Sequence, residues 1–329
     1  MLRTLAHRGA AGVGVVGGIV TLTFVLLHLA PGDPVRHLLG PAAEPAQIAE
    51  QRRALGLDRP LPAQYADWLG RFARGDWGTS LANGRPVARL IGAAWPFTIR
   101  LVALSLLLSY VLGIVIGTIQ AARGGSRLDT SLSVVTVTLF ALPGYWLGLM
   151  LVMLFSYWAR ALPAFGAAGL DADYLSVWSR ASDAVLHLVL PLVTLTLIGI
   201  GGTARYVRGA VLDTLAQPFV AAALAKGLPA ARIMRRHVLR NALLPVLTLL
   251  GLSLPALFSG TVFVEAVFGW PGVGGVLVQA VQARDYPVVM AATAVSAVLV
   301  VLGSVLAEAF GTWADPRLRT RSGRSHRES

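Results

Sequence analysis

Residues that usually carry chemistry are scarce in this chain, and their spacing suits none of the common reactions. The 329 residues include no cysteine, which excludes disulfides, iron–sulfur clusters and a cysteine nucleophile. Six histidines are scattered without ligand spacing or nearby acids, so we expect no metal site. The single lysine, Lys226, is followed by Gly227, whereas a Walker A phosphate loop requires Ser or Thr there. We therefore expect no catalytic residue, metal ligand or cofactor site on this chain.

The composition indicates a membrane protein. Hydrophobic residues make up 55% of the chain and charged residues only 13%, with a mean hydropathy of +0.67. Soluble domains carry about 25% charged residues, so a soluble enzyme is excluded. The formal net charge of +12 would suggest nucleic-acid binding in a soluble protein. We do not expect nucleic acid as a partner, because those cations would have to coexist with long exposed apolar segments.

Several windows without charged residues are long enough to cross the hydrocarbon core, which takes about 20 apolar residues. They predict an all-α integral membrane protein with six transmembrane helices, kinked locally at internal prolines such as Pro143. The windows are Ala10–Ala30, Leu101–Ala122, Ser131–Ala159, Ala184–Ala204, Ala242–Val264 and Val288–Ala307. Small-residue faces at Gly14-x-x-x-Gly18 and Gly113-x-x-x-Gly117 predict close helix packing. With six spans, both termini lie on the same side of the membrane. Arginines concentrate in the segments on that side, so the positive-inside rule predicts that both termini are in the cytoplasm.

The long segment Pro31 to Pro96 has the character of a soluble domain and is expected outside the membrane. Two short helices are predicted in it, from Glu44-Pro45 to Gly56 and from Pro62 to Phe72. The second has an amphipathic face formed by Tyr65, Trp68, Leu69 and Phe72. That face could contact lipid headgroups, pack on the helices of its own chain or meet a partner, and the sequence leaves these open.

The segment Arg205 to Asn241 is too polar to span a membrane, and the positions of its prolines and glycines predict two short helices. Pro218 suits the first helical position, an alanine-rich run follows, and Lys226 and Gly227 suit its end. Pro229 can start the second helix, which carries a stripe of arginines at helical spacing: Arg232, Arg235, Arg236 and Arg240. This loop is either a basic patch held by anionic headgroups or a docking element whose smooth alanine helix enters a partner's groove.

The run from Ala221 to Pro245 resembles the conserved loop of bacterial ABC importer permeases, in the variant of the dipeptide, oligopeptide and nickel group. Ala222, Ala223 and Gly227 hold the spacing of that signature, whereas Ala221 stands where the general form has glutamate. The resemblance implies that this loop's helix is the coupling helix, which seats in a cleft of the ATPase subunit.

The resemblance extends over most of Leu2 to Asp315. The matching segments are Leu29–Pro34, Leu55–Leu61, Gly75–Ser80, Phe263–Gly274 and Arg284–Pro287. The long segment after the first span resembles the first of the two permease subunits usual in these systems. The implied domains are residues 1–95, the first transmembrane helix plus external segment; 96–315, a five-helix permease core with its coupling loop at 205–241; and 316–329, an arginine-rich cytoplasmic tail.

The resemblance implies a permease subunit of an ATP-driven, binding-protein-dependent importer in the bacterial inner membrane, for peptides or a related small solute such as glutathione or a nickel complex. Its expected partners are a second homologous permease, two ATPases that bind ATP and Mg, an external solute-binding protein and the lipid bilayer. An ion-driven secondary transporter or channel is the alternative, and it should show buried acids along its pathway.

Two sets of residues are candidates for function. The expected ATPase-coupling surface consists of Ala222, Ala223, Lys226, Gly227, Arg232, Arg235 and Arg236. The candidates on the external face are Asp33, Glu265, Trp270 and Asp285. We expect Glu265 and Asp285 in the external turn after the fifth span, where ordering the loop by hydrogen bonds is the alternative role for these acids.

Overall fold

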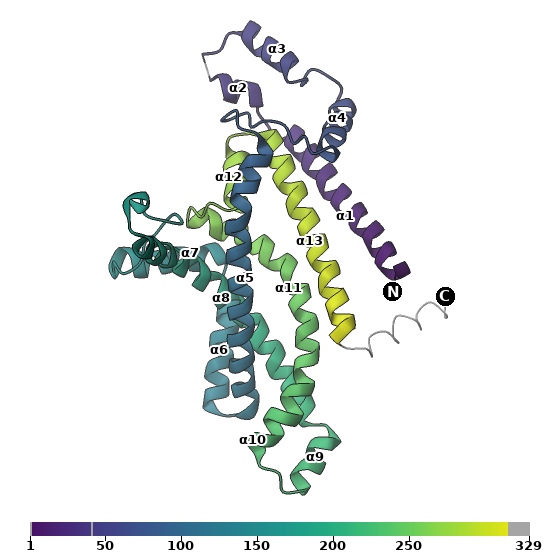
Figure 1. Ribbon diagram of the computed structural model, residues 1–329, viewed down its shortest axis with the longest axis vertical. Coiled ribbons are helices and arrows are strands. Elements are labelled where there is room, and N and C mark those ends of the chain that lie inside the picture. Colours follow the sequence, from purple (N-terminus) through teal and green to yellow (C-terminus); the bar gives the residue numbers. More distant parts are fainter. Residues whose placement is uncertain (1, 41, 315–329) are drawn as a thin grey trace. The chain divides into compact units, whose positions relative to one another are not determined.

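The chain folds into two compact units (Figure 1). The computed structural model describes residues 2–40 and 42–314. Unit 1 comprises the described residues within Met1–Ile99 and Gly269–Val301, and unit 2 those within Arg100–Phe268 and Leu302–Ser329. Residues 269–301, expected in the permease core, thus cluster with the first helix and the external segment. The arginine-rich tail 316–329 lies outside the described residues, and the three-part division stays a prediction.

The described part of the chain is helical, with one isolated antiparallel bridge between Thr79 and Pro86. Unit 1 holds α1 (Leu2–Leu29), α2 (Pro34–Leu39), α3 (Pro45–Ala54), α4 (Leu61–Ala73) and α12 (Val273–Gln282). Unit 2 holds α6 (Arg127–Ala141), α7 (Gly144–Leu151), α8 (Val177–Leu215), α9 (Pro218–Ala225), α10 (Ala230–Ile233) and α11 (Leu239–Val267). It also contains a π-helical segment η1 (Val152–Trp158), a 3-10 turn η2 (Ala172–Tyr174) and a π-helical turn η3 (Met234–Val238). The helices α5 (Val87–Ala122) and α13 (Tyr286–Ala314) contribute residues to both units.

All six predicted windows coincide with helices. Among the residues that the structure describes, four helices are long and apolar enough to cross a membrane: α1 over Ala11–Leu29, α5, α8, and α13 over Tyr286–Val305. A fifth candidate is the pair formed by α6 with α7 and η1. The window Ala242–Val264 falls within α11, partly on side chains outside the described set. An all-α, multi-pass architecture is confirmed, and the count of six spans stays a prediction.

The window Ser131–Ala159 does not form one kinked helix, as the sequence predicted. The helix axis turns by 106° between α6 and α7. Leu142, the residue before Pro143, has an extended backbone with ψ at 134°, and Pro143 precedes the first residue of α7. A proline ring disfavours helical geometry in the residue before it and supplies no N–H, so the chain breaks there instead of bending.

Glycines bring α8 into close contact with two neighbours inside unit 2. A Cβ on Gly113 of α5 would stand 2.7 Å from the side chain of Thr203, and one on Gly117 would stand 2.9 Å from the Cβ of Val207. On the other side of α8, a Cβ on Gly201 would stand 2.8 Å from the Cβ of Phe140 in α6. The predicted packing face on α5 is confirmed. Gly14 and Gly18 on α1, by contrast, have no other described part of the chain within contact distance.

The segment Pro31 to Pro96, which the sequence predicts to lie outside the membrane and which is called the external segment here, follows its predicted pattern of helices closely. A capping box between Glu44 and Gln47 begins α3, and α4 covers the second predicted helix. Three of the four residues on the amphipathic face of α4 pack on this chain: Tyr65, Trp68 and Phe72 contact a cluster containing Phe24 of α1 and Met290 of α13. Packing on its own helices therefore accounts for most of that face.

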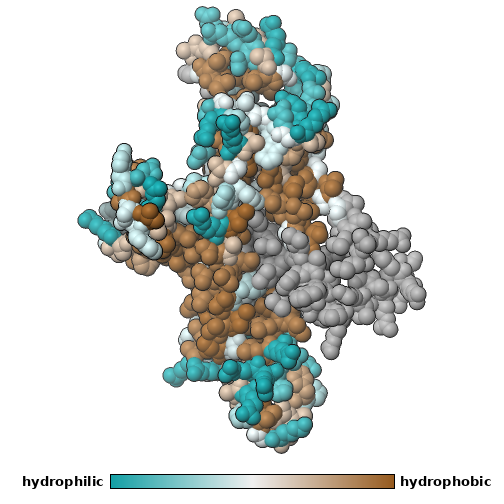
Figure 2. All heavy atoms as spheres, viewed as in Figure 1, coloured by the Kyte–Doolittle hydropathy of each residue, from teal (hydrophilic) through white to brown (hydrophobic). Residues whose placement is uncertain are grey.

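The surface of unit 2 separates into apolar and polar zones (Figure 2). The outer faces of its long helices are apolar, with Leu107, Val111 and Val134 at least half exposed. Hydrophilic surface returns at the end that carries α9 and α10. Such a band suits contact with hydrocarbon, because exposed patches of this kind are rare on soluble monomers.

Candidate functional site

Helix α9 has well-defined ends. The N–H of Gly227 donates to the carbonyl of Leu224 at 2.9 Å, and the N–H of Leu228 donates to that of Ala223 at 3.4 Å, which together form a Schellman motif. Gly227 has φ of +74°, a conformation that glycine adopts without steric cost. Pro218 occupies the first helical position at the other end. These features agree with the predicted helix from Pro218 and its glycine cap.

One face attaches α9 to unit 2. Val220 and Ala223 are buried in a cluster that includes Val211 of α8 and Val238 of η3. The remaining residues of the helix and its cap are exposed: Pro218, Phe219, Ala221, Ala222, Leu224, Ala225, Lys226 and Gly227. Of the predicted coupling residues, Ala223 therefore anchors the helix, whereas Ala222, Lys226 and Gly227 are available to a partner.

The predicted second helix of the loop is not a separate short element. Pro229 caps α10, which passes through the π-helical turn η3 directly into α11. Ile233 and Val238, five residues apart, are both buried, because a π turn brings positions i and i+5 onto one face. All four arginines of the stripe are exposed: Arg232, Arg235, Arg236 and Arg240. The five-residue spacing of the buried apolar residues was the available signal for this turn.

A buried ion pair that sequence reasoning missed joins α6 to α8. Asp129 is 4% exposed, and its two carboxylate oxygens accept hydrogen bonds at 2.8 Å from Nε and a terminal nitrogen of Arg208. The carboxylate also accepts the N–H of Gly125 at 3.1 Å, and Ser126 caps the helix that carries it. The two partners lie 79 residues apart in the chain, and no local pattern links them. The pair fixes the start of α6 to α8, two turns before α8 leads into α9.

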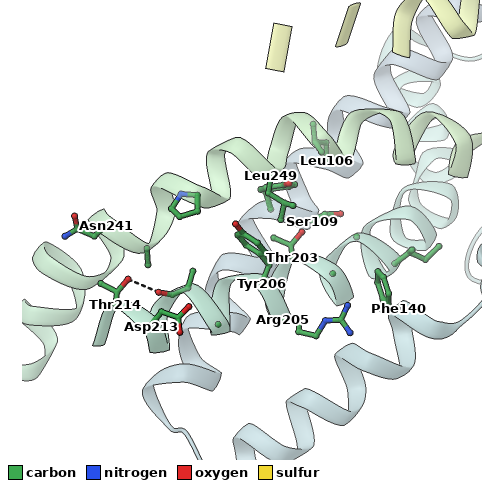
Figure 3. A pocket seen from close by; sticks show the side chains of 18 residues that line it. Leu106, Ser109, Phe140, Thr203, Arg205, Tyr206, Asp213, Thr214, Asn241 and Leu249 are labelled. Carbon is green, nitrogen blue, oxygen red and sulfur yellow. Dashed lines mark hydrogen bonds between the residues drawn. The ribbon is translucent and has the colours of Figure 1, made fainter. Parts of the chain in front are cut away.

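A cavity of about 860 Å³ lies within unit 2 (Figure 3). Its walls come from α5, α6, α8 and α11, and include Tyr110, Tyr206 and Pro245. The guanidinium of Arg205 lies 4.7 Å from the ring centre of Phe140, a cation–π contact. The polar residues at its wall are mostly uncharged: Ser109, Thr203, Thr214 and Asn241, with Asp213 the described carboxylate among them. The cavity reaches the last turn of α8, immediately before α9.

Three of the four external candidates make structural contacts within unit 1. Asp33 caps α2 through the N–H of Val35 and pairs with Arg52 at 3.2 Å. Trp270 is buried and donates its ring N–H to the carbonyl of Phe97 at 3.2 Å.

Asp285 fixes a loop of the external segment. It is 2% exposed and accepts the hydroxyl of Ser80 and the N–H groups of Leu81 and Ala82, the latter two at 3.1 and 3.2 Å. The carboxylate therefore orders residues 80–82 against the start of α13. This is the loop-ordering role that the sequence had left as its alternative.

Glu265 does not lie in an external turn. It is fully buried in the last turn of α11, which continues to Val267. The charge-free window ends at Val264, so the sequence predicts that the helix ends before Glu265. Helix ends are set by backbone hydrogen bonding, which continues beyond the apolar window here.

The fold and the loop define a class: a multi-pass, all-α membrane protein that exposes a short helix on the loop between two long helices. Two solved structures resemble the chain in fold. An inward-facing form of the MetNI methionine ABC transporter gives a TM-score of 0.54 at 17% identity, covering 70% of this chain and 98% of that one. An amino acid ABC transporter with histidines gives 0.50 at 14% identity, covering 68% and 94%.

The sequence comparisons then show the family. The model of the binding-protein-dependent transport system inner membrane component matches residues 113–320, and the N-terminal model for such membrane components matches residues 1–102. The oligopeptide permease protein AppB of Bacillus subtilis is 36% identical over 319 residues, covering 97% of this chain and 99% of AppB. The di/tripeptide permease protein DppB of Pseudomonas aeruginosa is 36% identical over 333 residues, with the same coverages. This chain belongs to that family and is a permease subunit of a binding-protein-dependent ABC importer in the inner membrane, and it is not itself an enzyme.

Proposed function

We propose that this chain is the first of two permease subunits of an ATP-driven importer for peptides or a related small solute such as glutathione or a nickel complex. Support for peptides comes from relatives that match almost its whole length. They include permease proteins named for oligopeptides, di- and tripeptides, and, in Escherichia coli, D,D-dipeptides at 36% identity. The chain contributes half of the solute path, and no covalent chemistry takes place on it.

The observation that carries the coupling role is the exposed surface of α9. An eight-residue helix with both ends defined is held by two buried side chains and presents small residues, together with Phe219 and Leu224, outward. Such a helix fits a groove on a partner, as short helices with apolar anchors do. The partner is an ATPase subunit that binds ATP and Mg, because this chain has no Walker A sequence.

The complete complex consists of this chain, a second homologous permease, two ATPases and an external solute-binding protein. Both termini face the cytoplasm, which places α9 on the ATPase side and the segment Pro31 to Pro96 on the side of the binding protein. When the ATPases close, α9 moves with them and carries the end of α8, because Val220 and Ala223 pack against it. The cavity beside Tyr206 and Thr214 adjoins that end of α8 and belongs to the inward-facing part of the path.

Uptake into vesicles tests the function. The complex would be reconstituted into proteoliposomes with its binding protein outside, and labelled di- and tripeptides would be supplied. We expect uptake that requires ATP inside and the binding protein outside, and that continues when an ionophore removes the proton gradient. Uptake that stops with the ionophore and ignores ATP would support the ion-driven alternative instead. Identifying by mass spectrometry the ligand that co-purifies with the binding protein would separate peptides from glutathione and nickel complexes.

A further inference from the structure

A second cavity, of about 690 Å³, lies within unit 1 and has no place in the transport mechanism described above. It is lined by the last two turns of α1, the first two turns of α13, the end of α3 and residues of the following stretch up to the end of α4. Its lining includes two kinds of residue that bear on ligand binding: arginines, and aromatic or apolar residues.

The arginines leave the cavity with positive charge that this chain does not balance. Arg53, Arg71 and Arg74 line it, are exposed, and form no ion pair among the described residues. Asp67 is the carboxylate among the described lining residues, and it is already paired with Arg59. Arg53 and Arg71 lie in the last turns of α3 and α4, where the helix dipoles offset part of their mutual repulsion. Unpaired guanidinium groups that line one cavity suit a phosphate or carboxylate as ligand.

The aromatic and apolar lining residues of this cavity form what is called its apolar wall here. Phe24 and His28 of α1 have ring centres 4.1 Å apart, and His28 and Tyr286 of α13 have ring centres 5.4 Å apart. Met290 and Trp68 complete this wall. Two of its ring nitrogens, Nε2 of His28 and Nε1 of Trp68, are buried without a hydrogen-bond partner in the described part of the chain. The wall thus offers apolar contact, and two buried nitrogens beside it have no hydrogen-bond partner in the described part of the chain.

The depth of the cavity in the membrane follows from the two spans that border it. The apolar span of α1 ends at Leu29, next to His28, and the span of α13 begins at Tyr286. Both ends meet at the cavity, so it lies where hydrocarbon gives way to headgroups. Tyr and Trp are enriched at this level in membrane proteins, and arginine there attracts anionic lipid.

We propose that this cavity binds an anionic phospholipid, whose phosphate is held by Arg53, Arg71 and Arg74. The apolar part of the lipid contacts the wall formed by Phe24 and Met290. The depth favours a lipid over a soluble anion, because the apolar wall is continuous with two membrane-spanning helices. The proposal depends on insertion in the membrane and not on the transported solute, so it can fail or hold independently of the proposed function.

The test is lipid retention by the whole transporter complex, purified in a mild detergent. Phosphatidylglycerol would be titrated in and counted per complex by native mass spectrometry, with phosphatidylcholine as the uncharged comparison. A triple variant would carry Arg53→Gln, Arg71→Gln and Arg74→Gln. Each arginine near an anionic headgroup contributes about a factor of five, so we expect the affinity of one phosphatidylglycerol site to fall about 100-fold.

A matched control removes the same charge elsewhere in the external segment. Arg36, Arg85 and Arg89 are exposed and do not line this cavity, so changing all three to Gln should leave that site occupied. Equal retention by wild type and the cavity variant, or equal loss in both variants, would overturn the proposal. Displacement of the lipid by inorganic phosphate or by a soluble acidic peptide at comparable concentration would also overturn it, in favour of a soluble ligand. If the triple variant does not assemble, the single variants, each expected to lose about five-fold, carry the same test.

Discussion

The buried pair between Asp129 and Arg208 predicts that the start of α6 depends on one carboxylate. Asp129→Asn preserves the shape of the side chain but removes its charge and replaces one acceptor oxygen with a donor that opposes the guanidinium. Two charge-assisted hydrogen bonds of about 1.5–3 kcal/mol each are weakened or lost. The Arg208 side chain is 34% exposed, so water recovers part of that energy. We expect a net loss of about 2–3 kcal/mol, below the roughly 3–5 kcal/mol that breaking a fully buried pair costs.

The assay is thermal unfolding of the purified complex, followed by amide hydrogen exchange of residues 121–133. A loss of this size should lower the unfolding midpoint by on the order of 5 °C and speed exchange at the turn between α5 and α6. A matched control exists in the same unit: Asp173 and Arg180 form a pair at 3.0 Å, but the Asp173 side chain is 94% exposed. Asp173→Asn should change stability by less than about 0.5 kcal/mol, as exposed pairs do.

The comparison between the two substitutions decides whether the reasoning holds. Equal midpoints for Asp129→Asn and Asp173→Asn would show that burial of the Asp129 pair has no energetic weight, and would refute it. A double-mutant cycle with Arg208→Gln separates the pair from other effects of the substitutions. We expect a coupling energy of about 2 kcal/mol, whereas a value near zero would assign the loss to α6 alone.

Three further predictions concern glycines and the external loop. Gly227→Val, at φ of +74°, should strain the cap of α9 by about 1–2 kcal/mol and lower the ATPase activity that the binding protein stimulates. The control is Gly92→Ala, at a helical site with open space around it, and an equal loss of activity there would contradict this prediction. Gly117→Val should block the contact between α5 and α8 and reduce the yield of folded protein in the membrane, whereas Gly18→Ala should not; equal yields would refute the close contact. Asp285→Ala should release the loop at residues 80–82, seen as faster cleavage there by an added protease; unchanged cleavage would show that backbone contacts alone hold the loop.

Local sequence signals predicted the elements that depend on local chemistry. Pro218 and Gly227 mark the ends of α9 because a missing N–H suits a helix start and a positive φ suits a helix end. The capping box at Glu44 and the amphipathic face of α4 were equally visible. Each of these signals lies within a few residues of the feature that it specifies, so a single sequence is enough to predict that feature.

Features set by partners distant in the sequence could not be predicted in this way. The contact of Arg208 with Asp129 depends on how α6 meets α8, and burial of Glu265 depends on the hydrogen bonding that carries α11 past its apolar window. The π turn before α11 is marked in the sequence by the five-residue spacing of Ile233 and Val238, which an α-helical period does not bring onto one face. The proline at position 143 also predicted a kink, whereas the structure has a complete break with a turn of 106°.

The glycine contacts change how motion of α9 is expected to spread through unit 2. Small residues between spans can let helices slide, but here Gly117 of α5 and Gly201 of α8 admit side chains or backbone of the neighbouring helix with no room for a Cβ. A shift of α8 by one helical turn would bring Leu197 or Arg205 to the place of Gly201 and force a clash with α6, since packed interiors tolerate little overlap. On α5 the same shift would bring Ala121 to the place of Gly117 in one direction and Gly113 in the other, so that contact resists sliding in one direction. The pair of Asp129 with Arg208 adds a third attachment at the same end of α8. We therefore expect α5, α6 and α8 to move as one rigid group when α9 moves, with the break before Pro143 free to absorb the change in angle.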